Sequence, residues 1–103
     1  RKVTMSTYAE EEAAKIKSVL TAAATYLEQF GWQKFQLGWD GGPRCILGAL
    51  SSGGAWRLSN TSISDLEERL HMAIGTDAPA AWNDQQDRTK EDVINALRKA
   101  AEL

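Results

Sequence analysis

Histidine and cysteine are nearly absent from this 103-residue sequence, which contains one of each, His71 and Cys45. A lone cysteine excludes an internal disulfide and suits a reducing compartment. One thiol and one imidazole cannot supply the ligands of a structural zinc site, and no carboxylates have calcium-loop spacing. The glycines match neither the dinucleotide-binding pattern nor the P-loop pattern. We therefore expect no metal site and no cofactor.

An excess of basic residues and a long apolar run are also missing. The 12 Lys and Arg against 14 Asp and Glu give a net charge of -2, which disfavours binding to nucleic acid or to an anionic membrane. No run approaches the roughly 18 apolar residues that span a bilayer, and the N-terminus lacks the features of a secretion signal. We expect a cytoplasmic protein without a membrane partner.

What the sequence does contain is apolar residues at helical spacing, most clearly in residues 8–30. Gly31 follows the last apolar residue and suits a left-handed helix cap. The side chains expected to face the core of this predicted helix are Ile16, Val19, Leu20, Ala23, Tyr26, Leu27 and Phe30.

Two further long helices carry signals at their ends. One has an apolar stripe that ends before Gly75, and its expected N-cap is Ser62 or Ser64. The other begins at Thr89, which forms a capping-box pattern with Asp92.

Two shorter helices are predicted between the long ones. The apolar run 45–50 reads as a buried helix with Pro43 in its first turn, and Pro79 reads as the first residue of a single helical turn. Gly48 disfavours a helix by about 1 kcal/mol relative to alanine. Its presence inside the first of these helices indicates that another segment of backbone passes close by.

The predicted fold is mainly α: a small single-domain helical bundle of three main helices plus two short ones, spanning residues 8–103. Residues 1–7 are interpreted as a disordered segment or as residues introduced by cloning. Around residues 33–45 the pattern changes to spaced aromatic residues and a strong turn sequence, Asp40-Gly41-Gly42-Pro43. Either a short β-hairpin or an irregular aromatic-rich loop fits this segment.

Four tryptophans are many for a chain of this length, and all lie near segment ends or loops. Tryptophan fills small cores, but it is also enriched at interaction surfaces. Trp39, beside the Asp-Gly turn, is the one most expected to be exposed. Together with the polar turn that follows Trp82, it defines the candidate interaction surface: Trp39, Asp40, Trp82, Asn83, Asp84 and Arg88.

Two short motifs give the chain a family resemblance: Cys-x-x-Gly-Ala at residues 45–49 and Trp-Asn-Asp-x-x-x-Arg-Thr at residues 82–89. With them, the chain resembles a family of small, functionally uncharacterised proteins of actinobacteria and their phages over nearly its whole length. The resemblance implies such an origin and no activity. In physical terms, Asn83 and Asp84 can close a helix or turn, and Arg88 can pair with Asp84 across it.

The function that we expect is that of a small non-enzymatic interaction protein, encoded by a phage, that binds a host protein in the host cytoplasm. The alternative is a nucleic-acid-binding regulator, which would require the arginines to gather on one face. A cysteine-dependent enzyme would need Cys45 next to His71, with Asp84 or Asp87 orienting the base. The sequence leaves the oligomeric state and the identity of the partner open.

Overall fold

The computed structural model describes the backbone of residues 4–103 and the side chains of residues 8–103. Its three long helices are α1 (Thr4–Phe30), α3 (Asn60–Ile74) and α5 (Lys90–Glu102). Two short helices, α2 (Ile46–Ser52) and α4 (Pro79–Asn83), and a 3-10 turn, η1 (Ala55–Arg57), lie in the connections. The mainly helical single-domain fold expected from the sequence is confirmed.

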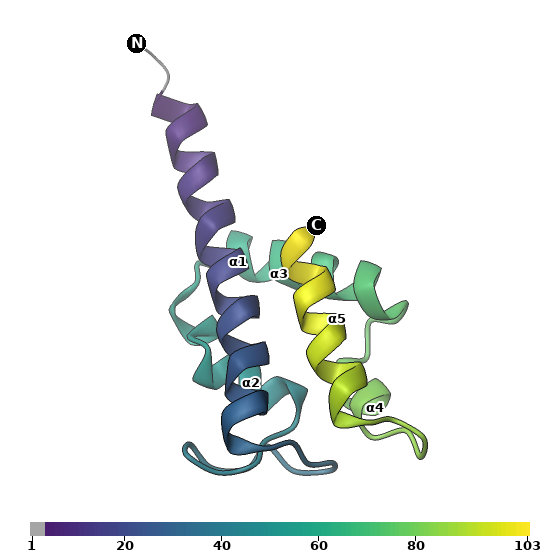
Figure 1. Cartoon of the computed structure of the whole chain (residues 1–103). Coiled ribbons are helices and arrows are strands. Elements are labelled where there is room, and N and C mark those ends of the chain that lie inside the picture. The colour runs from purple at the N-terminus through teal and green to yellow at the C-terminus, as the bar shows by residue number, and fades with distance from the viewer. Residues whose placement is uncertain (1–3) are drawn as a thin grey trace.

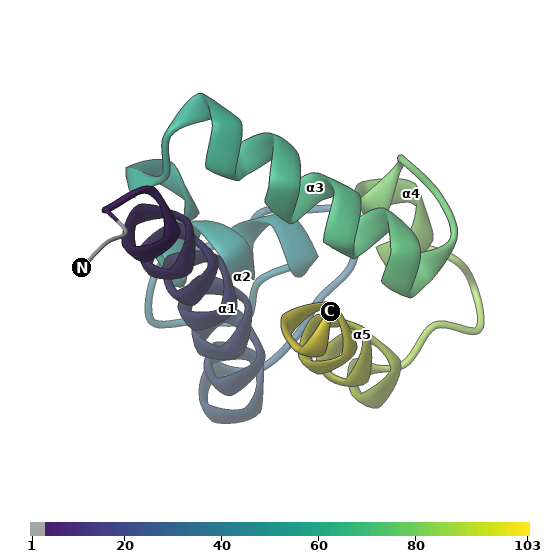
Figure 2. The ribbon, with the colours of Figure 1, turned by 90° about the horizontal axis from the view of Figure 1, so that it is seen from above.

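Three long helices enclose the core. α1 and α5 run side by side, and α3 crosses both of them (Figures 1 and 2). Their contacting faces are apolar: Leu20 and Leu27 of α1 and Val93 and Leu97 of α5 are fully buried. Burial of these stripes is what holds helices of this length in place, because isolated helices are marginal in water.

The first helix extends further than the sequence predicted. It begins at Thr4 rather than at residue 8, and residues 1–3 of the predicted N-terminal segment lie outside the described part. Its N-terminal turns project past the end of α5 (Figure 1). There the Ser62 hydroxyl donates a 2.6 Å hydrogen bond to Glu12 of α1. This bond, and a weaker one from Lys15, hold the pKa of the Glu12 carboxyl below its usual value.

Most predicted helix ends are confirmed. Thr89 and Asp92 form a reciprocal capping box, Pro79 is the first residue of α4, and Gly75 ends α3 with a φ of 80°. The start of α3 was predicted wrongly. Its N-cap is Ser59, whose side-chain oxygen accepts the Ser62 N–H, so the third helix starts at least three residues earlier than expected.

Two other local predictions are corrected. Phe30 is 43% exposed and lies against Tyr26, with ring centroids 4.8 Å apart, instead of facing the core. It is the last residue of α1. Pro43 does not enter α2, whose N-cap is Cys45; the proline stays in the preceding segment.

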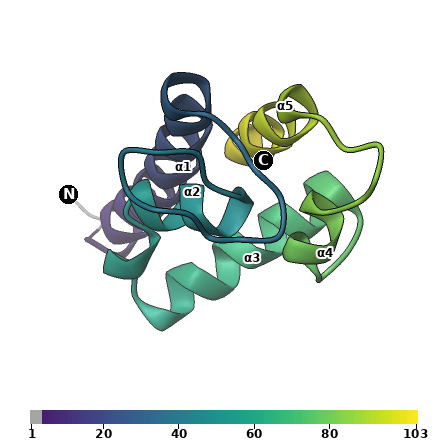
Figure 3. The same ribbon diagram turned by 90° about the horizontal axis from the view of Figure 1, so that it is seen from below.

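Residues 31–45 form an irregular loop and no hairpin. Within the described residues, the strand-like pairing in this loop is a single β-bridge between Trp32 and Arg44. The loop lies at the same end of the molecule as the connection from α4 to α5, which Figure 3 shows from below. It passes so close to α2 that a Cβ on Gly48 would lie 2.2 Å from the Leu37 carbonyl oxygen. The close backbone approach predicted at Gly48 is therefore confirmed.

Candidate interaction surface

Asn83, the last residue of α4, is a buried polar junction between three segments. Its side chain is fully buried. Its Oδ1 accepts the indole N–H of Trp32 at 2.7 Å and the N–H of Ile46, the first residue of α2, at 3.0 Å. Its Nδ2 donates to the Gln33 carbonyl at 3.2 Å and to Asp84 Oδ1 at 2.9 Å. We call this set of bonds the Asn83 clasp.

The clasp satisfies groups that would otherwise be costly to bury. A helix begins with N–H groups that have no partner inside the helix, and Cys45 makes no side-chain cap. Asn83, 37 positions away in the sequence, supplies the missing cap by accepting the Ile46 N–H. An unpaired buried donor costs about 1–3 kcal/mol, so the clasp secures α2, α4 and the loop against one another.

The residues that follow Asn83 continue this internal structure. Asp84 accepts the Phe35 N–H at 2.8 Å, and Lys34 donates to the Gln85 carbonyl at 2.6 Å. Arg88 donates to the Trp82 carbonyl and stacks on the Trp82 ring, 3.8 Å from its centroid. The predicted Arg88–Asp84 pair does not form, because each residue has other partners.

A second set of bonds fixes the turn that carries Trp39. The Tyr26 hydroxyl donates to the Gly42 carbonyl at 2.7 Å, with the Trp39 carbonyl oxygen at 3.1 Å, and accepts the Gly41 N–H at 2.8 Å. One side chain of α1 thus closes the turn from inside.

The same turn is held from the α2 side. Ser52 donates to Asp40 at 2.7 Å and accepts from Arg44 at 2.7 Å. Arg44 also donates through Nε to the Leu37 carbonyl at 3.0 Å. The loop is therefore connected to α1, α2 and the α4–α5 connection.

Large apolar side chains cover the outer side of this well-anchored loop. Phe35 is 76% exposed, Leu37 56% and Trp39 85%. Phe35 also has a φ of 72°, the left-handed region that a non-glycine residue adopts at a cost of about 1–2 kcal/mol. We call these three residues the loop patch. The stability of the fold does not require large apolar side chains to be exposed. It does not require a strained backbone that hydrogen bonds hold in place either.

An apolar groove lies beside the loop patch, between α2 and α3. It encloses about 310 Å³. Leu47 and Leu50 line it from α2, Ile63 and Leu70 from α3, with Trp56 of η1 and Pro79 of α4 completing the lining. Leu47 also lines a smaller hollow with Phe35 and Leu37, so the groove and the loop patch adjoin.

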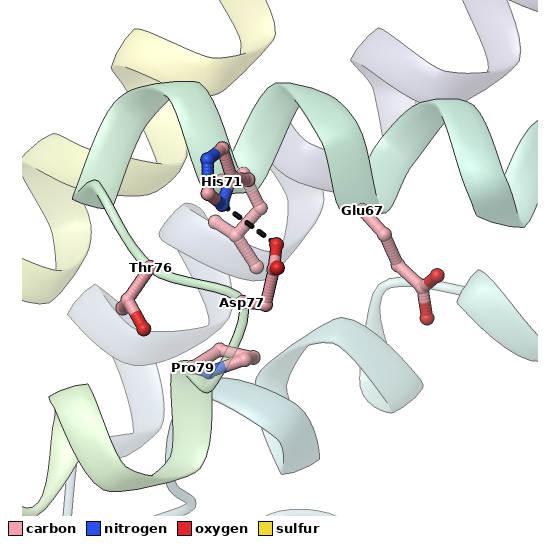
Figure 4. Close-up of a pocket in the computed structure, with 6 residues that line it drawn as sticks. Glu67, His71, Thr76, Asp77 and Pro79 are labelled. Atoms are coloured by element: carbon pink, nitrogen blue, oxygen red, sulfur yellow. Dashed lines mark ion pairs between the residues drawn. The ribbon is translucent and has the colours of Figure 1, made fainter.

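A third hollow, of about 230 Å³, continues the groove around the end of α3 (Figure 4). It contains the single histidine. His71 Nδ1 lies 2.6 Å from Asp77 Oδ1, and both side chains are well exposed. Cys45 is buried at the N-cap of α2 and does not line this hollow. His71 therefore has Asp77, and not the predicted cysteine, Asp84 or Asp87, as its partner.

The six residues of the predicted interaction surface divide into two groups. Trp39 and Asp40 are exposed on the loop, whereas Asn83 is in the interior, where it cannot contact a partner in the folded protein. Trp82, Asp84 and Arg88 are half-buried and take part in the internal bonds described above. Sequence reasoning missed Phe35 and Leu37, although apolar residues within a Gly-rich loop sequence are a signal that could have identified them.

Within the residues that the structure describes, no group of three or more His, Cys, Asp or Glu side chains could hold a metal ion. None of the helices that the structure describes is both long and apolar enough to cross a membrane.

Residues 11–103 match the model of a family of unknown function, DUF6197. The match covers most of the chain, so the protein belongs to this family, and the expected relation to a functionally uncharacterised family is confirmed. No curated protein and no solved structure matches the chain.

Proposed function

We propose that this member of the family DUF6197 is a small non-enzymatic interaction protein that binds a host protein through the loop patch. We further propose that an actinobacterial phage encodes it and that it acts in the host cytoplasm. The observation that carries the proposal is Phe35, a large apolar residue that is exposed although its backbone conformation is strained. Strain that persists next to exposed apolar surface is typical of recognition sites.

The rigidity of the loop supports the same conclusion. Binding costs conformational entropy when side chains and loops become ordered on contact. Here Tyr26, Arg44 and Asp84 already hold the backbone that carries the patch. Exposed aromatic side chains on a pre-ordered backbone are the kind of feature that serves as a binding hot spot.

The arginines favour a protein partner over nucleic acid. Arg44 bonds Ser52 and the Leu37 carbonyl, Arg88 stacks on Trp82, and Arg98 pairs with Glu28 at 2.7 Å. These three guanidinium groups make contacts in three different parts of the fold. A phosphate backbone, in contrast, is bound by cations that gather on one face.

The test is affinity capture from actinobacterial lysate by the tagged chain, with and without nuclease, compared with a Leu37→Ser/Trp39→Ser double variant. Met72→Ser is the matched control, because Met72 is 59% exposed on α3, away from the loop. We expect one stoichiometric protein that survives nuclease, is retained by Met72→Ser and falls at least about tenfold in the double variant, a loss of about 1.4 kcal/mol of binding.

Two results would overturn the proposal. Material captured without nuclease and lost with it would point to nucleic acid. Equal capture by the double variant and the parent chain would show that the loop patch takes no part in binding. Circular dichroism of both variants should match the parent, since the substituted side chains are mostly exposed.

A further inference from the structure

The apolar groove has the dimensions of a seat for a short helix. On α3, Ile63 and Leu70 are separated by seven residues, or two helical turns, which corresponds to about 10 Å. On α2, Leu47 and Leu50 are one turn apart and form the facing wall. An amphipathic helix presents apolar side chains at i, i+3, i+4 and i+7 over the same two turns.

The groove remains open because α2 and α3 each contact α1 more than they contact each other. Both rest on α1, while η1 contacts α2 and α4 contacts both α2 and α3. These short elements occupy the ends and leave the space between the two helices uncovered. Trp56 of η1 lies at one end of the groove and is 70% exposed. Its large side chain is therefore mostly in contact with water.

The carboxylates Glu67 and Asp77 line the groove and the hollow that continues it, whereas the Arg57 guanidinium stacks on Trp56 at one end, 4.8 Å from the ring centroid. Glu67 lines both the groove and the hollow that continues it, and Asp77 lines that hollow. Figure 4 shows both carboxylates on the same side of α3. Among the described residues that line these two hollows there is no Lys or Arg, and Glu67 has no ion-pair partner within that part of the chain.

We infer that the groove binds a basic amphipathic helix of a partner protein. Apolar side chains of that helix lie between Leu47 and Ile63, and a flanking Lys or Arg pairs with Glu67. This inference rests on the proposed function and makes it specific: the loop patch and the groove adjoin at Leu47, so one partner covers both.

The experiment uses the full chain and a displayed library of peptides of about 14 residues, roughly four helical turns. Four fixed leucines occupy positions i, i+3, i+4 and i+7, and the remaining positions draw equally on Ala, Gln, Glu and Lys. Selected peptides are then measured by fluorescence anisotropy against the parent chain and against Trp56→Ser, Glu67→Lys and, as the matched control, Met72→Ser, an exposed α3 residue that does not line the groove.

We expect selection of Lys-rich peptides with a Kd on the order of 10 µM. Trp56→Ser should weaken binding at least about tenfold, Glu67→Lys should shift the selection toward Glu-rich peptides, and Met72→Ser should leave peptide binding unchanged. The folded state of each variant is checked by circular dichroism.

Several results would overturn the inference: no enrichment, enrichment of Glu-rich peptides by the parent chain, or equal binding by Trp56→Ser. A dimer of the parent chain that is lost in Trp56→Ser would assign the groove to a second copy instead. If any of these occurs while Leu37→Ser/Trp39→Ser still abolishes capture of the host protein, the proposed function stands without the groove. If capture survives that double variant, the proposed function itself falls.

Discussion

The 31–45 loop reverses the usual distribution of polar and apolar groups between the inside and the outside of a protein. The inner side is polar: Asn83 and Tyr26 bond backbone and side-chain groups that are shielded from water. The outer side is apolar, with Phe35, Leu37 and Trp39 largely exposed. Buried polar groups and exposed apolar patches are the informative exceptions to ordinary burial, and here both occur in one segment.

We propose that the two sides have separate roles. Polar bonds on the inner side hold the backbone in one conformation, which a loop of this length would not keep without them. The outer side contributes little burial, and at Phe35 it costs backbone strain. Stability should therefore depend on the inner side and binding on the outer side, which the following variants separate.

The largest effect should come from removing the Asn83 side chain. In Asn83→Ala, the Trp32 indole N–H and the Ile46 N–H lose their acceptor. Two donors left unpaired in a shielded position should lower the free energy of unfolding by about 3 kcal/mol, as measured by urea denaturation.

The matched control for this variant is Asn95→Ala on α5, an exposed asparagine within a helix. It should change the free energy of unfolding by less than about 0.5 kcal/mol, and in the stabilising direction, because alanine favours helix. Equal effects at residues 83 and 95 would contradict the assigned role of the clasp.

A smaller effect is expected at the other inner contact. Tyr26→Phe removes the hydroxyl that closes the turn of residues 39–42 and leaves the ring in place. We expect a loss of about 1 kcal/mol and faster amide exchange at Gly41, whose N–H donates to that hydroxyl. Tyr8→Phe is the control, since Tyr8 is 62% exposed. Unchanged exchange at Gly41 would mean that the turn does not depend on Tyr26.

Local chemistry made the helices predictable, and long-range contacts made the loop unpredictable. Thr89 and Gly75 mark helix ends through bonds to residues a few positions away, and Pro79 marks a helix start through its fixed φ. Such signals can be recognised in a sequence. Asn83 bonds residues 37 and 51 positions distant. The sequence around Asn83 suggested a turn residue at the surface, because no neighbouring residue reveals that Trp32 and Ile46 converge on Asn83.

The candidate surface shows the same limit. Trp39 was identified because a Gly-rich turn follows it directly. Phe35 was not. Its positive φ occurs together with a hydrogen bond from its N–H to Asp84, 49 residues away, and such a distant partner cannot be inferred from the residues around Phe35.

The smallest effect on stability, and the sharpest separation of the two sides, is expected at Phe35. Phe35→Gly relieves the left-handed strain of about 1–2 kcal/mol, and the greater freedom of glycine in the unfolded chain offsets part of that gain. Because the ring is largely exposed, little burial is lost, and the net result should be about 0.5 kcal/mol of stabilisation in urea denaturation. Capture of the host protein should nevertheless fall, as a trade between stability and function predicts. Phe35→Ala keeps the strain and removes the same ring, so it should weaken capture equally without the gain in stability. A Phe35→Gly protein that is less stable than Phe35→Ala would mean that the ring supports the fold, and the outer side of the loop would then lose its separate role.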